Sequence, residues 1–241
     1  MGRTVIGFFV ALGVLLSGIG TSIGADELVP VTTTDGTSFN YILTTNQPQK
    51  IAYAVILMPG GGGQLNPRLE DGKLVFAFGG NFLIRSRTLF ADNQFVAAST
   101  NSTTTPGRIL AIVADLEKRY GKIQVYVVGT SRSTESTLSF SKSLDGQVAG
   151  FIHSSSMNAI SGLDVRNAKS RNLIVLHKLD ACRVTSPSAG QAAANKNGIE
   201  LIVMEGGKST GDDCEAYAYH GYYGIERETV DRMKAWIVQG R

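Results

Sequence analysis

Residues 123–133 have the sequence IQVYVVGTSRS, and this segment is the most informative part of the chain about its fold. Its first part, Ile123 to Val128, is a mostly apolar run of the kind that forms a strand buried inside a parallel sheet. The residues that follow, Arg132 to Ser143, are compatible with a helix. Gly129 lies at the junction and has no side chain, so it can enter a tight turn. We therefore predict a strand, a sharp turn that carries Ser131, and a helix.

The rest of the chain alternates between predicted strands and helices. The first two strands, at residues 28–34 and 38–44, are joined through Asp35-Gly36, a strong hairpin signal. Later strands are predicted at residues 52–58, 95–99, 123–128, 148–153, 172–177 and 199–204, and helices at 108–120, 132–143, 191–197 and 226–239. This order predicts an α/β fold with a mostly parallel central sheet, helices on both faces and an antiparallel hairpin at its beginning.

A Rossmann fold is the competing interpretation of such alternation. That fold normally has its glycine-rich phosphate loop after the first strand. Here the glycine run Gly60 to Gly63 follows the third predicted strand. The position of the glycines therefore favours a different α/β fold.

The first 25 residues have the pattern of a secretory signal peptide. Arg3 provides a basic start, Val5 to Leu16 is an uncharged apolar run, and small residues follow as far as Ala25. The apolar run is short for a transmembrane helix, although an uncleaved membrane anchor is the alternative. We expect a secreted or periplasmic protein in which residues 26–241 form one domain, without stable membrane association after cleavage.

The charge of the predicted mature chain is nearly balanced. Arg3 is the one charged residue of the signal, so 22 basic and 20 acidic residues remain. Such a balance does not favour nucleic acid or an acidic surface as a partner. The sequence also lacks the Cys/His clustering and spacing of a metal site, and no cofactor is implied.

Polar and glycine residues follow several of the predicted strands. Gly60 to Gly63, Ser131, Asp180 and His220 each come after a different strand. Functional groups of parallel sheets gather at the carboxyl ends of the strands, so these residues are the candidates for a common site.

The chain order of serine, acid and histidine, with a glycine loop upstream, resembles the α/β-hydrolase superfamily over essentially the whole mature chain. More narrowly, the chain looks like small, lid-poor secreted bacterial hydrolases of that superfamily. The segments that carry this resemblance are Gly129-Thr130-Ser131-Arg132, Asp180-Ala181-Cys182, Cys214-Glu215-Ala216 and Tyr219-His220-Gly221-Tyr222. Fewer than twenty residues separate the strands that end near 153 and begin at 172, so a large cap domain is not expected there.

The resemblance implies a triad in which Ser131 is the nucleophile, His220 the general base and Asp180 the residue that orients His220. The superfamily usually has glycine two positions after the nucleophile, where this chain has Ser133. A serine at a helix start can instead be a simple N-cap. The alternatives for the base are His153 and His177, which end apolar runs, and those for the acid are Asp145, Asp164, Asp212 and Asp213.

The resemblance also implies an oxyanion hole. One backbone N–H would come from Gly61 or Gly62 in the glycine run, and the second from Arg132, directly after the nucleophile. The same glycine run is also compatible with a flexible turn that has no chemical role.

Cys182 and Cys214 are the only cysteines of the chain. In an exported protein we expect them to form a disulfide, and this bond would tie the Asp180 loop to the His220 loop. Two unpaired buried thiols are the alternative.

The sequence thus predicts an exported serine hydrolase that acts on a small-molecule or polymer-derived ester, or a related acyl substrate, through an acyl-enzyme. A catalytically silent domain that binds a ligand or partner is one alternative, and a peptidase with the same triad is another. Arg85 and Arg87 are candidates for binding an acidic substrate group or for a solvated helix face. The tyrosines at 217, 219, 222 and 223 are candidates for a pocket or for core packing.

Overall fold

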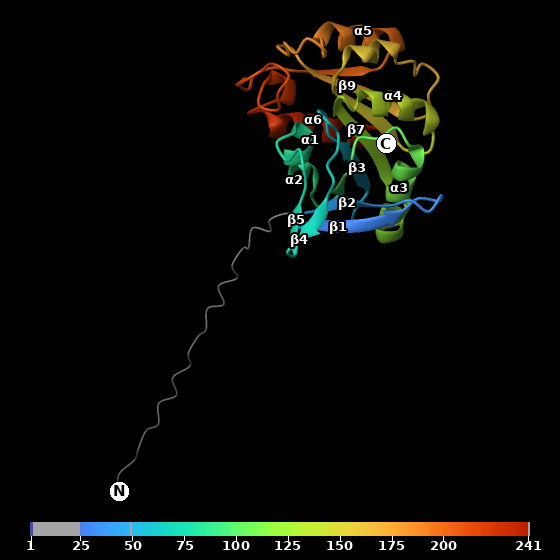
Figure 1. Cartoon of the computed structure of the whole chain (residues 1–241), viewed down its shortest axis with the longest axis vertical. Coiled ribbons are helices and arrows are strands. Elements are labelled where there is room, and N and C mark those ends of the chain that lie inside the picture. Colours follow the sequence, from blue (N-terminus) through green and yellow to red (C-terminus); the bar gives the residue numbers. More distant parts are fainter. Residues whose placement is uncertain (2–24, 49, 241) are drawn as a thin grey trace.

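A computed structural model describes residues 1, 25–48 and 50–240 of the chain (Figure 1). The predicted signal peptide, residues 1–25, lies outside the described residues except at its two ends. Within the described part of the chain, no helix is both long enough and apolar enough to cross a membrane.

An eight-stranded sheet forms the centre of the protein, in the order β1-β2-β6-β3-β7-β8-β9-β10. β1 and β2 form an antiparallel hairpin, β2 also pairs antiparallel with β6, and the remaining pairs are parallel. The strands are β1 (Ala25–Thr32), β2 (Ser38–Thr45), β3 (Tyr53–Met58), β6 (Phe95–Ser99), β7 (Gln124–Ser131), β8 (Gly150–Ser156), β9 (Arg171–His177) and β10 (Glu200–Met204). The predicted mostly parallel sheet with an antiparallel start is confirmed.

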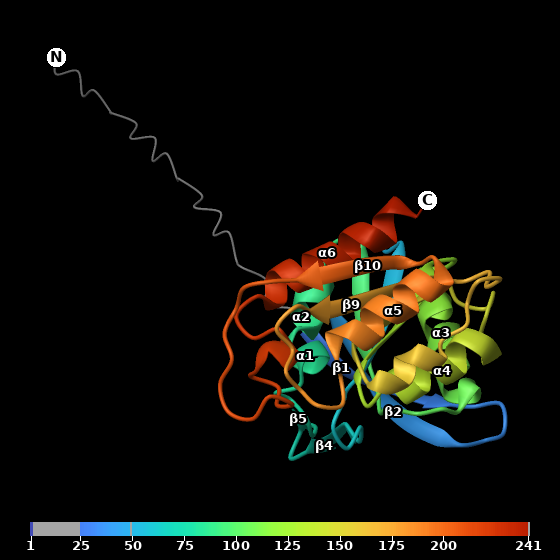
Figure 2. The same ribbon diagram turned by 90° about the horizontal axis from the view of Figure 1, so that it is seen from above.

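Helices cover both faces of the sheet. They are α1 (Phe82–Arg85), α2 (Arg87–Phe90), α3 (Pro106–Tyr120), α4 (Thr134–Ser143), α5 (Pro187–Asn197) and α6 (Glu226–Gln239), with 3-10 turns η1 (Asn158–Gly162) and η2 (Tyr219–Gly221). Ile112 of α3 and Phe140 of α4 belong to one buried cluster, and Phe82 of α1 and Trp236 of α6 belong to another. Figure 2 shows α6 and α5 on opposite sides of β10.

The two clusters arise because the side chains of each strand alternate between the two faces of the sheet. In β3, Ala54 and Ile56 belong to the cluster that includes α3, whereas Val55 and Leu57 belong to the cluster that includes α6. Successive strand residues point to opposite faces, so a strand with apolar residues on both sides needs cover on both sides. All six residues of β3 are buried accordingly.

Several elements differ from the predicted bounds by a few residues, and the clearest differences are at α5 and between β3 and β6. Helix α5 begins at Pro187, four residues before the predicted start, because proline is well suited to the first turn of a helix. Residues 64–94, for which no strand was expected, include a small hairpin of β4 (Arg68–Glu70) and β5 (Lys73–Val75). Only η1 lies between β8 and β9, as expected for a site without a large cap at that connection.

Candidate active site

Ser131 is the last residue of β7 and lies on a sharp turn into α4. Its backbone φ is +53°, a left-handed conformation that residues other than glycine seldom adopt. Such strain occurs where the surrounding structure holds a residue in place, and it is frequent at functional sites. The predicted strand, turn and helix are confirmed, and the turn leaves Ser131 partly exposed at the carboxyl edge of the sheet.

Gly129 is required by the close packing of this turn. A Cβ atom built on Gly129 would lie 2.7 Å from Cγ2 of Thr137 and 2.8 Å from the carbonyl oxygen of Ser133. Both distances are shorter than ordinary carbon contacts, so any larger residue would push α4 away from β7. Gly129 therefore lets the helix begin directly beneath Ser131.

Asp180 and His220 form a buried pair on the neighbouring loops. Nδ1 of His220 lies 2.9 Å from Oδ2 of Asp180, and the side chains of both residues are less than a tenth exposed. The carboxylate also accepts hydrogen bonds from the backbone N–H of Cys182, at 3.0 Å, and from Oγ1 of Thr185, at 3.0 Å. A carboxylate held in this way can fix the orientation and tautomer of the imidazole.

Thr185 was not among the residues singled out from the sequence. Its hydroxyl lies between the two partners, 3.0 Å from Oδ2 of Asp180 and 3.2 Å from Nδ1 of His220. The only sequence signal was its position five residues after Asp180. Nothing in that spacing predicts a contact with His220.

Hydrogen bonds of Ser155, at the end of β8, and of Tyr222 fix the backbone of the loop that carries His220. The hydroxyl of Ser155 donates to the carbonyl of His220 at 2.7 Å. The hydroxyl of Tyr222 donates to the carbonyl of Val175 at 3.0 Å and accepts the N–H of Ser155 at 3.1 Å. Tyr222 is fully buried, and this burial raises its pKa to about 12. These contacts place His220 relative to strands β8 and β9.

Arg85 supports the same loop from α1. Its guanidinium donates to the carbonyl oxygens of Gly80 and Gly221, each at 2.6 Å, and forms an ion pair with Glu226. Arg87 pairs with Asp26. Both arginines are therefore engaged by the protein itself, rather than solvated or free to bind an acidic substrate group.

The other two histidines, His153 and His177, have hydrogen-bond partners of their own. His153 is fully buried and bonded through its two ring nitrogens to Thr137 and Asn172, at 2.9 and 3.0 Å. Burial lowers its pKa to about 4. His177 is also fully buried and stacks on Tyr219, with Nε2 2.9 Å from the carbonyl of Gly206. Neither histidine lines the pocket that contains Ser131.

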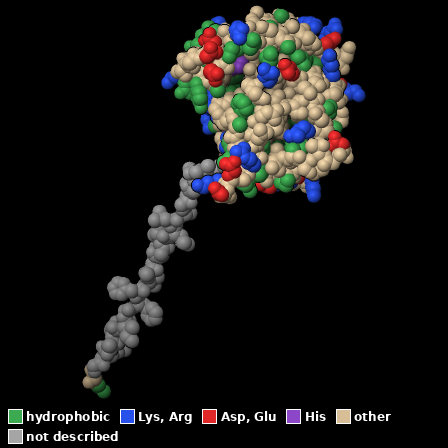
Figure 3. Space-filling view, viewed as in Figure 1, with side chains coloured by type: hydrophobic (Ala, Val, Ile, Leu, Met, Phe, Trp, Pro, Cys, Tyr) green, Lys and Arg blue, Asp and Glu red, His purple; other side chains and the backbone are tan. Residues whose placement is uncertain are grey.

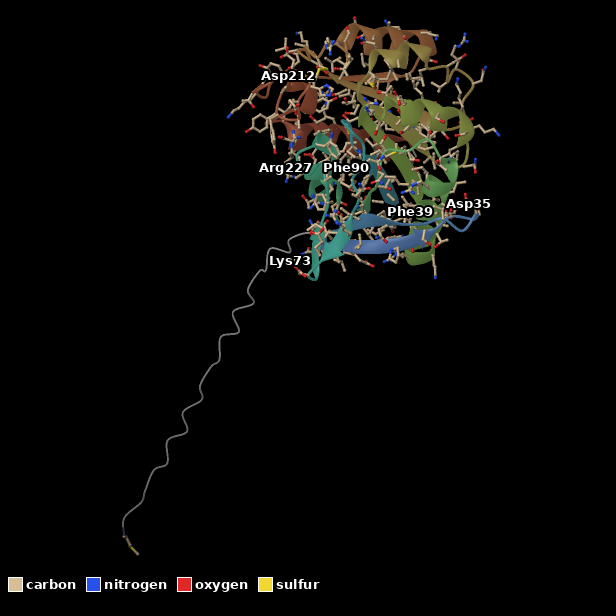
Figure 4. The ribbon with its side chains drawn as sticks, in the orientation of Figure 1. Asp35, Phe39, Lys73, Phe90, Asp212 and Arg227 are labelled. Carbon is tan, nitrogen blue, oxygen red and sulfur yellow. A yellow bond between two sulfur atoms is a disulfide. The ribbon has the colours of Figure 1, made fainter. Side chains whose placement is uncertain are left out.

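The alternative acids lie away from His220 or have other partners. Asp145 accepts the backbone N–H groups of residues 169 and 170, and Asp164 pairs with Arg166. Asp212 accepts the N–H of Cys214 and lies on an outer loop, as Figure 4 shows. Of the four alternatives together with Asp180, the structure brings only Asp180 into hydrogen-bonding contact with His220.

Cys182 and Cys214 form a disulfide, as predicted. The described residues contain no free cysteine. Cys182 is two residues after Asp180, and Cys214 lines the pocket beside His220. The disulfide therefore joins the loop that carries the acid to the loop that carries the histidine.

A pocket of about 210 Å³ contains both Ser131 and His220. Its lining residues are Gly60, Gly61, Phe78, Asn81, Phe82, Thr130, Ser131, Cys214, Glu215, Ala216, His220 and Gly221. The hydroxyl of Ser131 makes no hydrogen bond with His220, or with any other described residue. Hydrogen bonds between a nucleophile and its base are often formed only when substrate binds. None of the tyrosines near His220 lines this pocket, whose aromatic residues are Phe78 and Phe82.

The glycine run lies beside Ser131 because β3 pairs with β7, with Met58 opposite Gly129. A Cβ atom built on Gly60 would lie 2.8 Å from Cβ of Ser131, so glycine is needed for this close approach. Gly61 lines the pocket, whereas Gly62 and Arg132 line a neighbouring hollow. Between the two glycines predicted as oxyanion donors, only Gly61 thus borders the space next to Ser131.

The face of the molecule in Figure 3 has no strong charge pattern. Figure 3 shows acidic and basic side chains interspersed over the face that it presents. Within the described residues, no group of three or more His, Cys, Asp or Glu side chains could hold a metal ion.

No protein-family model and no curated protein matches the sequence. Solved structures do match. A protein of unknown function from Agrobacterium tumefaciens, assigned to the α/β hydrolases, has a TM-score of 0.62 at 11% identity, covering 89% of this chain and 98% of its own. A serine hydrolase without a lid from Xanthomonas campestris has a TM-score of 0.54 at 10% identity, with 86% and 94% covered. An esterase domain from Rhodothermus marinus has a TM-score of 0.60 at 9% identity, with 88% and 97% covered.

At such low identity, these similarities concern the arrangement of the backbone. The mostly parallel eight-stranded sheet is consistent with this fold, and the connection of β8 to β9 without a large insertion is consistent with the structure that has no lid. The protein has the α/β-hydrolase fold.

Proposed function

We propose that the protein is an exported serine hydrolase of carboxylic esters that works through an acyl-enzyme. The observation that carries the proposal is the placement of Ser131 and His220 in one pocket, with Asp180 bonded to Nδ1 of His220. An esterase among the structures with this fold supports the ester as substrate class, and the disulfide supports a place outside the cytoplasm.

In the first half of the reaction, the hydroxyl of Ser131 attacks the ester carbonyl carbon and its proton passes to Nε2 of His220. Nδ1 of the imidazole donates to Asp180, so Nε2 is the nitrogen left to accept this proton. The backbone N–H groups of Gly61 and Arg132 stabilise the oxyanion that forms. His220 then gives the proton to the departing alcohol, and the acyl group stays on Ser131.

In the second half, water takes the place of the alcohol. His220 removes a proton from the water as it attacks the acyl carbon, and returns this proton to Ser131 when the carboxylic acid leaves. Asp180 remains a carboxylate throughout and stabilises the charged imidazole each time it forms. No cofactor takes part in this scheme.

The pocket supports an ester with a small acyl group. Its volume of about 210 Å³ is below the range that drug-sized ligands need. The ring of Phe78 lies against Gly61 and Gly62 and supplies apolar surface on the side of the glycine run, whereas Phe82 packs on Tyr222 of the His220 loop. The departing alcohol must be near His220 to receive its proton, so we assign the acyl group to the Phe78 side.

Labelling with a fluorophosphonate tests the proposal together with ester hydrolysis. The wild-type chain is expected to be labelled and to hydrolyse p-nitrophenyl acetate, whereas Ser131→Ala loses both activities. Absence of labelling and hydrolysis in the folded wild type would favour a silent binding domain. Faster cleavage of peptide than of ester substrates would favour a peptidase.

A further inference from the structure

Ser133 occupies the position at which the turn of this superfamily usually has glycine, and its side chain has definite partners. It is completely buried. Its Oγ lies 2.6 Å from the carbonyl oxygen of Pro59, the residue between β3 and the glycine run. It also lies 2.9 Å from Oγ of Ser102. The serine therefore bridges the Ser131 turn and the glycine run, which are far apart in the sequence.

The direction of these hydrogen bonds follows from the chemistry of the groups. A carbonyl oxygen can only accept, so the hydroxyl of Ser133 donates to Pro59. The same hydroxyl is also placed to donate to Oγ of Ser102, at the longer distance. Oγ of Ser136 lies 3.0 Å from that of Ser102, and either of these two hydroxyls can donate to the other. Pro59 is thus the nearer of the two acceptors of the Ser133 hydroxyl.

The bond from Ser133 to Pro59 joins the two parts of the proposed oxyanion hole. Ser133 directly follows Arg132, and Pro59 precedes Gly61 by two residues. The described chain has no cis peptide bonds, so the carbonyl of Pro59 and the N–H of Gly60 point in opposite directions. A hydrogen bond that holds this carbonyl also sets the plane of the first peptide of the glycine run.

The next peptide is set by the loop itself. The N–H of Gly63 donates to the carbonyl of Gly60 at 3.1 Å, which turns the N–H of Gly61 away from the inside of this turn. The glycine run is thus held at two successive carbonyls, one by Ser133 and one by Gly63. Only the first of these bonds connects the run to the nucleophile's own turn.

We propose that Ser133 is a positioning residue that sets the distance between the two oxyanion donors, the N–H groups of Gly61 and Arg132. The inference rests on the proposed ester hydrolase function. An oxyanion hole stabilises the transition state only when its donors are already in place, and loss of one donor lowers kcat by about 100- to 1,000-fold. Loosening one donor without removing it is expected to cost less, about 10-fold.

The experiment compares Ser133→Ala and Ser133→Gly with Ser141→Ala. Ser141 is also buried, lies on the same helix and donates its hydroxyl to a backbone carbonyl, that of Leu138, at 3.0 Å. It has no contact with the glycine run. Each variant is measured for kcat and KM on p-nitrophenyl acetate and for its melting temperature. We also measure the affinity of each variant for a trifluoromethyl ketone. This inhibitor adds to Ser131 and places an oxyanion in the oxyanion hole.

Ser141→Ala loses one hydrogen bond and Ser133→Ala loses its contacts with Pro59 and Ser102, so we expect a decrease in melting temperature of about 2–4 °C for Ser141→Ala and a larger one for Ser133→Ala. Only the two Ser133 variants should lose about 10-fold in kcat, with KM within about twofold and an equal loss of affinity for the ketone. A purely structural role would lower the melting temperature without this parallel loss of kcat and ketone affinity.

Three results would overturn the inference. The first is a wild-type kcat in the folded Ser133→Ala and Ser133→Gly variants. The second is an equal loss of kcat in Ser141→Ala. The third is a loss confined to KM. In all three the wild type remains active, so the proposed function stands while the positioning role fails. A wild type without hydrolysis or fluorophosphonate labelling would overturn the proposed function, and the positioning role with it.

Discussion

The two halves of the candidate site are held in different ways. The nucleophile side consists of residues 129–134, Pro59 and the glycine run 60–63. It lies at the ends of adjacent parallel strands and is held by close backbone packing and short serine hydroxyl contacts. The acid–base side consists of the loops that carry Asp180 and His220, which follow β9 and β10. These loops are joined to each other by a disulfide and to the rest of the protein by a few long side chains.

The difference shows which parts of the site the sheet itself can hold. On the nucleophile side, strands β3 and β7 bring the two segments within contact distance, so small residues are sufficient. The loop of residues 205–218 has no helix or strand of its own, and its backbone is too long to be held by the sheet alone. The disulfide and the hydrogen bonds of Arg85 and Tyr222 hold the acid–base side in place instead.

The largest expected effect is on the nucleophile side, where one substitution should abolish activity and leave stability unchanged. Ser131→Ala removes the attacking oxygen, and kcat/KM on p-nitrophenyl acetate should fall by at least about 1,000-fold. The hydroxyl of Ser131 makes no hydrogen bond with any described residue, so the melting temperature should stay within about 1 °C of wild type. Steady-state kinetics and thermal unfolding test this. Activity within tenfold of wild type would show that Ser131 is not the nucleophile.

The next effect should appear on the acid–base side. The disulfide closes a loop with a sequence separation of 32 residues, and its loss from a Cys182→Ser/Cys214→Ser variant should cost about 3–4 kcal/mol of stability in the chain-entropy model. Activity should fall as well, because Cys214 lines the pocket and the N–H of Cys182 bonds to Asp180. Denaturant unfolding and kinetics measure both, with dithiothreitol treatment of the wild type as a parallel test. Unchanged activity in the folded double variant would mean that this side needs no cross-link.

A third effect is the pH dependence of the free energy of unfolding, and it comes from His153, which lies next to the nucleophile side. His153 bonds to Thr137, whose methyl group packs against Gly129. Its pKa is about 4 in the fold and its ordinary value is 6.5, so the unfolded chain binds more protons between these pH values. The free energy of unfolding should therefore decrease as the pH falls from 6.5 to 4, by up to about 3 kcal/mol.

Urea unfolding between pH 7.5 and pH 4.5 measures this decrease. In His153→Gln the portion that comes from His153 should disappear, while the disulfide remains intact on the other side. An identical pH dependence in wild type and variant would assign the acid sensitivity to other groups.

The smallest effect concerns the shape of the pocket. Phe78 is 39% exposed, has a φ of +55° and lies with its ring against Gly61. Phe78→Ala should lengthen the acyl side of the pocket and raise kcat/KM for p-nitrophenyl octanoate relative to the acetate by about 10-fold. Leu69→Ala is the control, because Leu69 is exposed on β4 and does not line the pocket. A change in preference for the alcohol group alone would place the acyl group on the opposite wall.

Much of the fold could be predicted because the relevant signals are local. Apolar runs mark buried strands wherever they occur, and Asp35-Gly36 predicts a hairpin without reference to the rest of the chain. The short helices α1 and α2 and the β4–β5 hairpin were not predicted as they are. Segments of three or four residues carry too little periodicity to identify, and their packing against the core decides their conformation.

The fold class, the position of the turn at Ser131 and the order of the three candidate site residues can be read from the sequence. Three further features are visible only in the folded protein: Asp180 bonds to His220, Gly61 rather than Gly62 borders the pocket, and Ser133 bonds to Pro59. The two groups differ because the interactions have different ranges. Strand and turn preferences act within a few residues, whereas these contacts join segments that are between 40 and 74 residues apart and meet only when the sheet is complete.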